Sequence, residues 1–461
     1  MISSFQKYDV VETYCVNGIK VSVLEFQLPL CYQTLADETP ERVPVCVKIV
    51  NNTKINKPQW DYESDIVKNK DKLLLFLQGG PGFPTAFCSG AGDPPFLKPL
   101  LDRGFTVVLL DQRGTGLSCA IDADLLLSKG TVHEQFEFIK NFRADSIVRD
   151  SEFIRHSLIG HSKWTLLGQS FGGFTSVTYL SLFPNSLKQV LLTGGLPPIL
   201  INDVKDVYDA TIKHTEDRCI AFYKKFPQDI ERVWDIIDHL NSNDVKLPNG
   251  GKLSANRFRH LGLRFGGSGG TFSLHRIVTS LWTDIKQRKN ISYATKKSVQ
   301  DSLGFETNVL YFLFQEAIYC NGKGISSKWA AQRALKEEWL HTDRSKGKFM
   351  FTGEMAFENM LDDYIELGKL KELAHYIHSY DQWGVLYNIE ALKSLALKEI
   401  PIVALVYLDD QYVDYELAKR NKDLFSYTPY ITNGLFHNGL TASSEEVLNK
   451  LFGLLENGEY M

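Results

Sequence analysis

Three residues of this chain have side chains that together could carry out nucleophilic catalysis: Ser170, Asp410 and His437. A serine hydroxyl is a weak nucleophile until a histidine removes its proton, and an acidic side chain must orient that histidine. The residues occur in the order serine, acid, histidine. This set predicts hydrolysis through a covalent acyl intermediate, and we expect neither a metal ion nor another cofactor.

The serine is distinguished by its surroundings. Ser170 lies in GQSFG (residues 168–172), between an apolar run and a stretch that can begin a helix. A sharp turn there strains the serine backbone, and side chains two residues away on either side would collide. Ser268 lies in a similar pentapeptide, GGSGG, but residues 259–265 before it suit a buried strand poorly. We predict that Ser170 is the nucleophile and Ser268 belongs to a loop.

The acid and the base follow a late apolar run, residues 400–407. Asp410 is our choice of acid, with Asp409 and Asp414 as alternatives, and we expect at least one of the three to cap the next helix. His437 is the one histidine that follows these carboxylates in the sequence. It is therefore the predicted base.

The oxyanion of a tetrahedral intermediate needs hydrogen-bond donors. The apolar run 73–77 ends in QGGPG, residues 78–82. Glycines at the carboxyl end of a strand allow a backbone N–H to point into a site without obstruction. We predict the amides of Gly80 and Phe171 as the two donors.

The elements that must position these residues alternate between strand and helix. Residues 19–26 and 43–50 have the alternating pattern of half-buried antiparallel strands. Nearly continuous apolar runs, typical of parallel strands buried on both faces, lie at 73–77, 105–110, 164–167, 190–192 and 400–407. Helical periodicity at 144–158 completes the pattern. It predicts an α/β fold with a mostly parallel sheet flanked by helices.

The character of the chain changes at about residue 199, where charged segments with helical periodicity begin, such as 204–240 and 326–340. We predict three parts: a first part of the core at 1–198, a mainly helical cap at 199–390, and a second part of the core at 391–461. The last part carries the acid and the histidine.

Composition excludes several functions. A net charge of −4 without a basic cluster argues against nucleic-acid binding. No apolar stretch reaches the ~20 residues of a membrane span, so no membrane partner is expected. The seven cysteines are scattered, and the N-terminus lacks the pattern of a signal peptide. These features predict a cytoplasmic protein.

Longer stretches resemble the proline iminopeptidase (prolyl aminopeptidase) family of the α/β-hydrolases, in its longer form. They are QGGPG at 78–82, DQRGTGLS at 111–118, FRADSIVRD at 142–150, GQSFGG at 168–173, and the segments around Asp410 and His437. DQRGTGLS is the most distinctive, because hydrolase chemistry alone does not require it. The resemblance implies the α/β-hydrolase fold and a serine aminopeptidase that releases N-terminal proline from peptide substrates.

Two cap stretches, QEAIYC at 315–320 and FTGEM at 351–355, resemble the family's segments for the substrate end. The resemblance implies that Glu316 and Glu354 bind the substrate's α-amino group, a cation next to the scissile bond. Phe314 or Tyr319 could line an apolar slot for the pyrrolidine ring. Gln78 departs from the histidine that many α/β-hydrolases carry there, and FENM at 357–360 is more polar than the family's pattern.

Two alternatives to this predicted function remain. One is an esterase or amidase on the same scaffold with a different acyl specificity. The other is a non-catalytic binding protein of the hydrolase fold, against which the intact serine, acid and histidine argue.

Overall fold

The computed structural model describes residues 8–33, 41–53, 57–397 and 400–457. Its centre is a nine-stranded sheet in the order β1-β2-β3-β5-β4-β6-β7-β8-β9. The strands are β1 (Asp9–Val16), β2 (Ile19–Pro29), β3 (Arg42–Asn52), β4 (Leu73–Leu77), β5 (Thr106–Leu110), β6 (Trp164–Gln169), β7 (Leu187–Thr193), β8 (Ile402–Tyr407) and β9 (Thr428–Thr432). β1, β2, β3 and β5 pair antiparallel in turn, and every pair from β5 to β9 is parallel. The predicted mostly parallel sheet is confirmed.

Helices cover both faces of the parallel strands. Leu74 and Phe76 of β4 face the side of α2 (Leu97–Asp102) and α21 (Ser444–Glu456). Leu75, between them, faces the opposite side, where α5 (Ala144–Ile159) and α6 (Phe171–Leu182) pack. This alternation follows from the two-residue period of a strand, and it explains why the sequence runs are apolar throughout.

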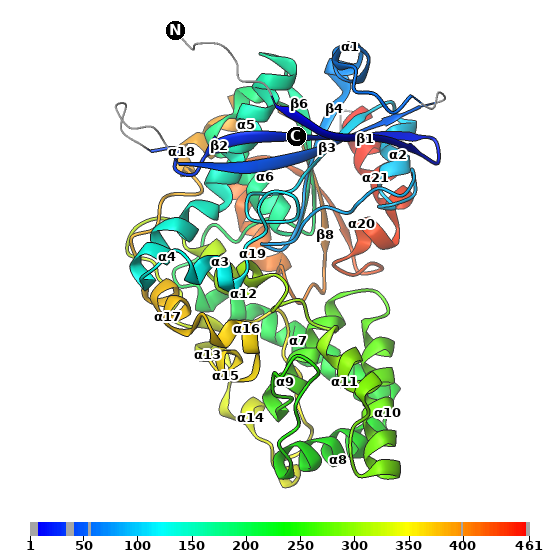
Figure 1. Ribbon diagram of the computed structural model, residues 1–461, viewed down its shortest axis with the longest axis vertical. Helices are drawn as coiled ribbons and strands as arrows, with labels where there is room; N and C mark the ends of the chain where they lie inside the picture. The colour runs from blue at the N-terminus through cyan, green and yellow to red at the C-terminus, as the bar shows by residue number, and fades with distance from the viewer. Residues whose placement is uncertain (1–7, 34–40, 54–56, 398–399, 458–461) are drawn as a thin grey trace.

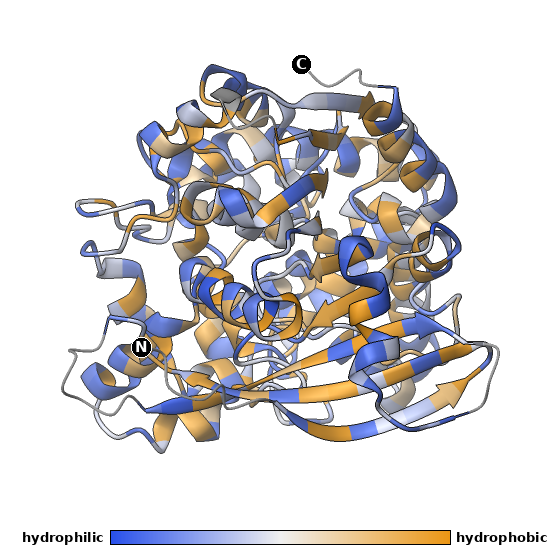
Figure 2. Cartoon of the chain, turned by 90° about the horizontal axis from the view of Figure 1, so that it is seen from above, coloured by the Kyte–Doolittle hydropathy of each residue, from blue (hydrophilic) through white to orange (hydrophobic). Residues whose placement is uncertain are grey.

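The N-terminal strands differ from the prediction in one respect. Figure 2 shows polar and apolar residues interleaved along them, yet almost every side chain in residues 19–26 of β2 and 43–50 of β3 is buried rather than every second one. Lys20 and Lys48 sit inside the protein because each has a carboxylate partner, Asp65 and Asp111, with Nζ–Oδ distances of 2.7 Å. In the sequence, a lysine in a strand suggests a solvent-facing side chain. Here each lysine is instead buried beside a carboxylate.

The chain between β7 and β8, called the insertion below, is mainly helical. Figure 1 places most of it beyond one end of the sheet. Its helices include α7 (Lys205–Lys225), α8 (Asp229–Ser242), α9 (Ala255–Arg259), η4 (His260–Gly266), α10 (Gly270–Arg288), α11 (Tyr293–Gln300), α12 (Val309–Phe314), η5 (Ala317–Tyr319), α13 (Ala330–Ala334), α14 (Glu337–Leu340), α15 (Met360–Asp363), α16 (Ile365–Gly368), α17 (Lys371–Ser379) and α18 (Ile389–Lys393). No helix in the described ranges is long and apolar enough to cross a membrane.

The insertion also packs against helices that precede β6. Phe136 of α4 (Val132–Ile139) contacts the rings of Tyr376, Tyr380 and Trp383 at centroid distances of 4.8, 4.4 and 5.7 Å. The predicted boundaries between core and cap, at residues 198 and 390, therefore stay a prediction. The helix α4, which belongs to the predicted core, shares a hydrophobic cluster with the insertion.

One predicted helix is interrupted. Residues 326–340 form two short helices, α13 and α14, instead of one. Lys328 and Trp329 have φ values of 50° and 54°, and Leu335 is extended. These backbone conformations cannot continue a helix.

The DQRGTGLS stretch anchors the loops around the site. Asp111, just after β5, accepts hydrogen bonds from Lys48 Nζ at 2.7 Å and from the amide and hydroxyl of Thr85 at 2.9 and 2.6 Å. Arg113 pairs with Asp150 of α5 at 2.5 Å, with both side chains fully buried. The stretch thus joins β3, the segment after the QGGPG turn, and α5.

Candidate active site

The nucleophile turn has the geometry that its glycines require. Ser170 lies between β6 and α6 with φ 55° and ψ −124°, and its amide donates to Thr193 O at 2.9 Å. A Cβ on Gly172 would lie 1.8 Å from Leu77 O, and one on Gly168 would lie 2.4 Å from Gly172 O. No side chain fits at either position. The expected strand, strained serine and helix are all present.

The acid and the base meet at the carboxyl ends of the last two strands. His437 Nδ1 lies 2.6 Å from Asp410 Oδ2, and the two residues are only 8% and 4% exposed. Burial would lower the pKa of His437, but the nearby carboxylates of Asp410 and Glu354 raise it overall. The amide of Tyr412 donates to the other oxygen, Asp410 Oδ1, at 2.9 Å. The carboxylate is thus held from both sides.

The two alternative acids have other partners. Asp409 is exposed, and its backbone carbonyl accepts from Arg218 Nη2 of α7 at 3.0 Å. Asp414 accepts from the amide of Leu417 at 2.8 Å and so caps α19 (Tyr415–Lys419), which confirms that one of the three carboxylates is a helix cap. Asp410 is the one that contacts the histidine.

The QGGPG turn lies against the nucleophile. A Cβ on Gly79 would be 3.0 Å from the Cβ of Ser170, and Gly80 has φ 134°, which favours glycine. Phe171 is the first residue of α6, so its N–H has no acceptor within the helix. The predicted donors, Gly80 and Phe171, therefore belong to the two segments that border Ser170.

Ser268 is an exposed loop residue before α10, as expected, but the loop has a contact that the sequence does not indicate. The amide of Ser268 donates to Asn438 Oδ1 at 2.8 Å, and the amide of His437 donates to Gly266 O at 3.0 Å. The second glycine-rich pentapeptide thus supports the histidine loop.

Glu354 lies on the catalytic side of the insertion. Tyr311 Oη donates to Glu354 Oε1 at 2.6 Å. Burial raises the pKa of this carboxyl group, while the charge of His437 and the hydrogen bond from Tyr311 oppose that rise. A carboxylate close enough to interact with the predicted base, His437, could bind a substrate cation beside the scissile bond.

Glu316 is fully buried and already has several partners. Its oxygens accept from the amides of Ala330 and Ala331, both at 2.8 Å, and His378 Nδ1 lies 3.1 Å from Oε2. Burial and then the charges of both glutamates, Glu316 and Glu354, raise the pKa of Tyr208. The charges of both glutamates therefore act on the same buried tyrosine.

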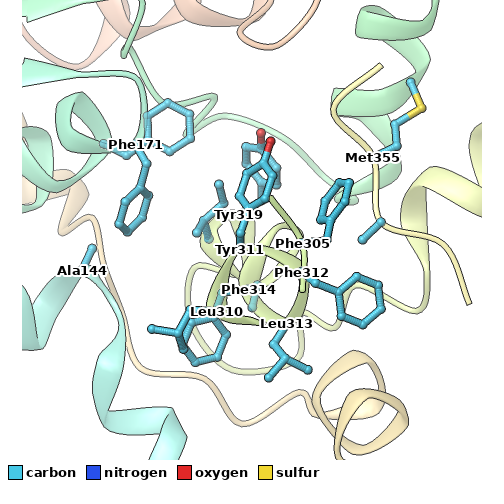
Figure 3. Close-up of a cluster of buried hydrophobic side chains, with 14 of the residues drawn as sticks. Ala144, Phe171, Phe305, Leu310, Tyr311, Phe312, Leu313, Phe314, Tyr319 and Met355 are labelled. Atoms are coloured by element: carbon cyan, nitrogen blue, oxygen red, sulfur yellow. The ribbon is translucent and has the colours of Figure 1, made fainter. Parts of the chain in front are cut away.

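Aromatic side chains lie between the nucleophile helix and the insertion. Figure 3 shows Phe171, Tyr311, Phe314 and Tyr319 in one cluster. Tyr319 contacts the rings of Phe174 and Tyr208 at centroid distances of 5.9 and 6.3 Å. The structure thus brings both predicted slot residues, Phe314 and Tyr319, into one apolar group.

Arg143 of the FRADSIVRD stretch binds the backbone on both sides of Tyr319. Its Nη2 donates to the carbonyls of Ala317 and Cys320 at 2.8 and 2.5 Å, and its guanidinium lies 4.4 Å from the centroid of the Trp383 ring. No role for this arginine was predicted from the sequence, where its place in a stretch that resembles the family is the signal that points to it.

Comparison with known proteins agrees with this geometry. The profile of the family described as alpha/beta hydrolase fold matches residues 72–237. The chain is 38% identical over 443 residues to a proline iminopeptidase of Aeromonas sobria, covering 96% of this chain and 98% of that relative. It is 35% identical over 394 residues to proline iminopeptidase aneH of Aspergillus aculeatus, covering 83% and 85% of the two chains. The chain belongs to the proline iminopeptidase family of α/β-hydrolases.

Proposed function

We propose that this protein is a serine aminopeptidase that releases N-terminal proline from peptides. The observation that carries the proposal is the 2.6 Å contact between Tyr311 and Glu354, which holds a carboxylate near His437. A generic esterase site has no need of an anion there, whereas an aminopeptidase must recognise a cation one residue from the bond it cleaves. The names of the relatives from Aeromonas sobria and Aspergillus aculeatus support the same substrate.

The chemistry follows from the assigned roles. Ser170 Oγ attacks the carbonyl carbon of the N-terminal residue while His437 Nε2 takes its proton. Asp410, on Nδ1, fixes the imidazole tautomer and stabilises the cation that forms. The amides of Gly80 and Phe171 donate to the oxyanion. His437 then protonates the leaving amine, and water hydrolyses the acyl-enzyme by the same route.

The two glutamates have different capacities for the amino group. Glu354 accepts hydrogen bonds from the side chains of Tyr311 and Gln315, and the remaining acceptor positions of its carboxylate can take a substrate N–H. Both oxygens of Glu316 already accept backbone amides, although a carboxylate has about four acceptor positions in all. We assign the direct contact with the substrate's amino group first to Glu354. Glu316 adds negative charge and can accept one further hydrogen bond. The aromatic group around Tyr319 receives the pyrrolidine ring.

We also propose a cytoplasmic location, because the seven cysteines are scattered along the chain without a spacing typical of a disulfide framework. The substrate there would be free peptide rather than a membrane or nucleic acid.

Turnover of prolyl, alanyl and N-acetylprolyl coumarin amides, beside p-nitrophenyl acetate, tests the function. The proposal expects the prolyl amide to be the best substrate and the N-acetylated one to react poorly. Fast ester turnover with negligible prolyl-amide turnover would favour an esterase. Absence of fluorophosphonate labelling in the folded protein would favour a non-catalytic binding protein.

A further inference from the structure

The acid loop and the histidine loop are both attached to the insertion through η4 and the residues after it. The amide of His437 donates to Gly266 O at 3.0 Å, and Gln411 Nε2 donates to Gly262 O at 3.2 Å. Acid and base are thus supported by the same short segment, which belongs to neither of their strands.

Tyr412 contacts the acid, the base and η4. Its amide donates to Asp410 Oδ1 at 2.9 Å, and its ring meets the imidazole of His437 edge-on, with centroids 4.7 Å apart and planes at 76°. Its hydroxyl donates to the carbonyl of Leu263 in η4. One side chain therefore spans from the catalytic pair to the insertion.

The fit between Tyr412 and η4 is close. A Cβ on Gly266 would lie 2.1 Å from Tyr412 Cζ, so only glycine allows the ring its present place. Burial and then the charge of Glu354 raise the pKa of Tyr412, so the hydroxyl remains a donor at any working pH. The ring of Tyr412 is thus tightly packed between the imidazole and the insertion, and its hydroxyl stays protonated.

We propose that Tyr412 is a positioning residue that couples the insertion to the catalytic base. Its hydroxyl bond to Leu263 fixes the ring, the ring restrains the imidazole of His437, and its amide restrains Asp410. The alignment of His437 toward Ser170 then depends on how the insertion is seated. This inference rests on the triad assigned under the proposed function and is independent of the proline specificity.

Tyr412→Phe tests the link, because it keeps the ring and removes the hydroxyl bond. We expect kcat for the prolyl amide to fall on the order of 10-fold with KM within about twofold, since small misplacements of a catalytic group are costly. The rate of fluorophosphonate labelling should fall by the same factor. Tyr407→Phe is the matched control: its ring lies 6.2 Å from the same imidazole, but its hydroxyl lies beside Gly439 of the core.

Gly266→Ala disturbs the same contact from the insertion side and should reproduce this kinetic signature. The double variant should lose less than the product of the two single losses, because both changes break one contact. Unchanged kcat and labelling in Tyr412→Phe, or a rise in KM alone, would overturn the proposal. Wild-type protein that resists labelling, or Ser170→Ala that keeps it, would instead refute the triad on which the proposal rests.

Discussion

The nucleophile turn and the glutamate side of the site are built in different ways. Ser170, Gly80 and Phe171 owe their places to glycines only a few residues away, and two of the three contribute backbone groups. Glu316 and Glu354 lie in the insertion and depend on partners distant in sequence, such as Tyr311 and Ala330. The first region is locally encoded; the second exists only after tertiary packing.

This difference separates two kinds of functional consequence. Damage to the nucleophile region should remove chemistry for every acyl substrate, because all of them pass through the same tetrahedral intermediate. Damage to the glutamate region should change which substrate is accepted and leave the reaction of neutral esters intact. Substitutions in the two regions distinguish these outcomes.

The largest effect is expected for Ser170→Ala. It should lower kcat for prolyl and ester substrates alike by about 10⁴-fold or more, because no other nucleophile is placed at the turn. Ser268→Ala is a matched control from the second glycine-rich pentapeptide and should retain wild-type rates. A similar loss in both variants would contradict the assignment of Ser170.

Glu354→Gln should lower kcat/KM for the prolyl amide on the order of 100-fold, as expected for the loss of one charge-assisted contact to a buried cation. Turnover of p-nitrophenyl acetate should change little. Glu358→Gln, four residues further along, removes a more exposed carboxylate and serves as the control. Equal losses with the amide and the ester would mean that Glu354 serves the chemistry rather than the substrate.

The pH profile should show the coupling between the two regions. The pKa of His437 is raised above 6.5 in the folded protein. As the pH decreases, ester turnover should therefore begin to fall while the pH is still above 6.5. Glu354→Gln removes one of the charges that raise it and should move this acidic limb to lower pH. An unmoved limb in the variant would show that Glu354 does not act on the base.

The smallest effect concerns a contact between the insertion and the acid loop. His214 Nε2 lies 3.0 Å from Asp414 Oδ2, and this hydrogen bond raises the pKa of His214. The stabilisation is complete below pH 6.5 and is lost as pH rises through the folded-state pKa. His214→Asn should cost at most about 1 kcal/mol at pH 6 and less at pH 8, measured by urea unfolding.

The exposed His133 provides the control for that measurement. His133→Asn should leave the difference in stability between the two pH values as it is in the wild type. An undiminished cost of His214→Asn at pH 8 would assign the effect to packing instead of protonation.

The sheet and the nucleophile turn could be predicted because their signals are local. The run 73–77 is β4 itself, and the glycines around Ser170 stand beside it in the sequence, although Gly172 is required by a contact with Leu77 of the neighbouring strand. The partners of Glu316 could not be predicted in this way, since α13 begins only at Ala330, after the positive φ values of Lys328 and Trp329, and its first two amides donate to the carboxylate. The support of His437 by Gly266 is likewise a contact between distant segments.

The order of the strands has a consequence for synthesis of the protein. Val190 of β7 pairs with Ile402 of β8, so the sheet cannot be completed until the whole insertion has left the ribosome. A nascent chain that ends before residue 402 contains Ser170 but neither Asp410 nor His437. If the proposed triad is correct, the enzyme stays inert during translation, and we expect its hydrolytic activity to begin only when the last segment of the chain docks.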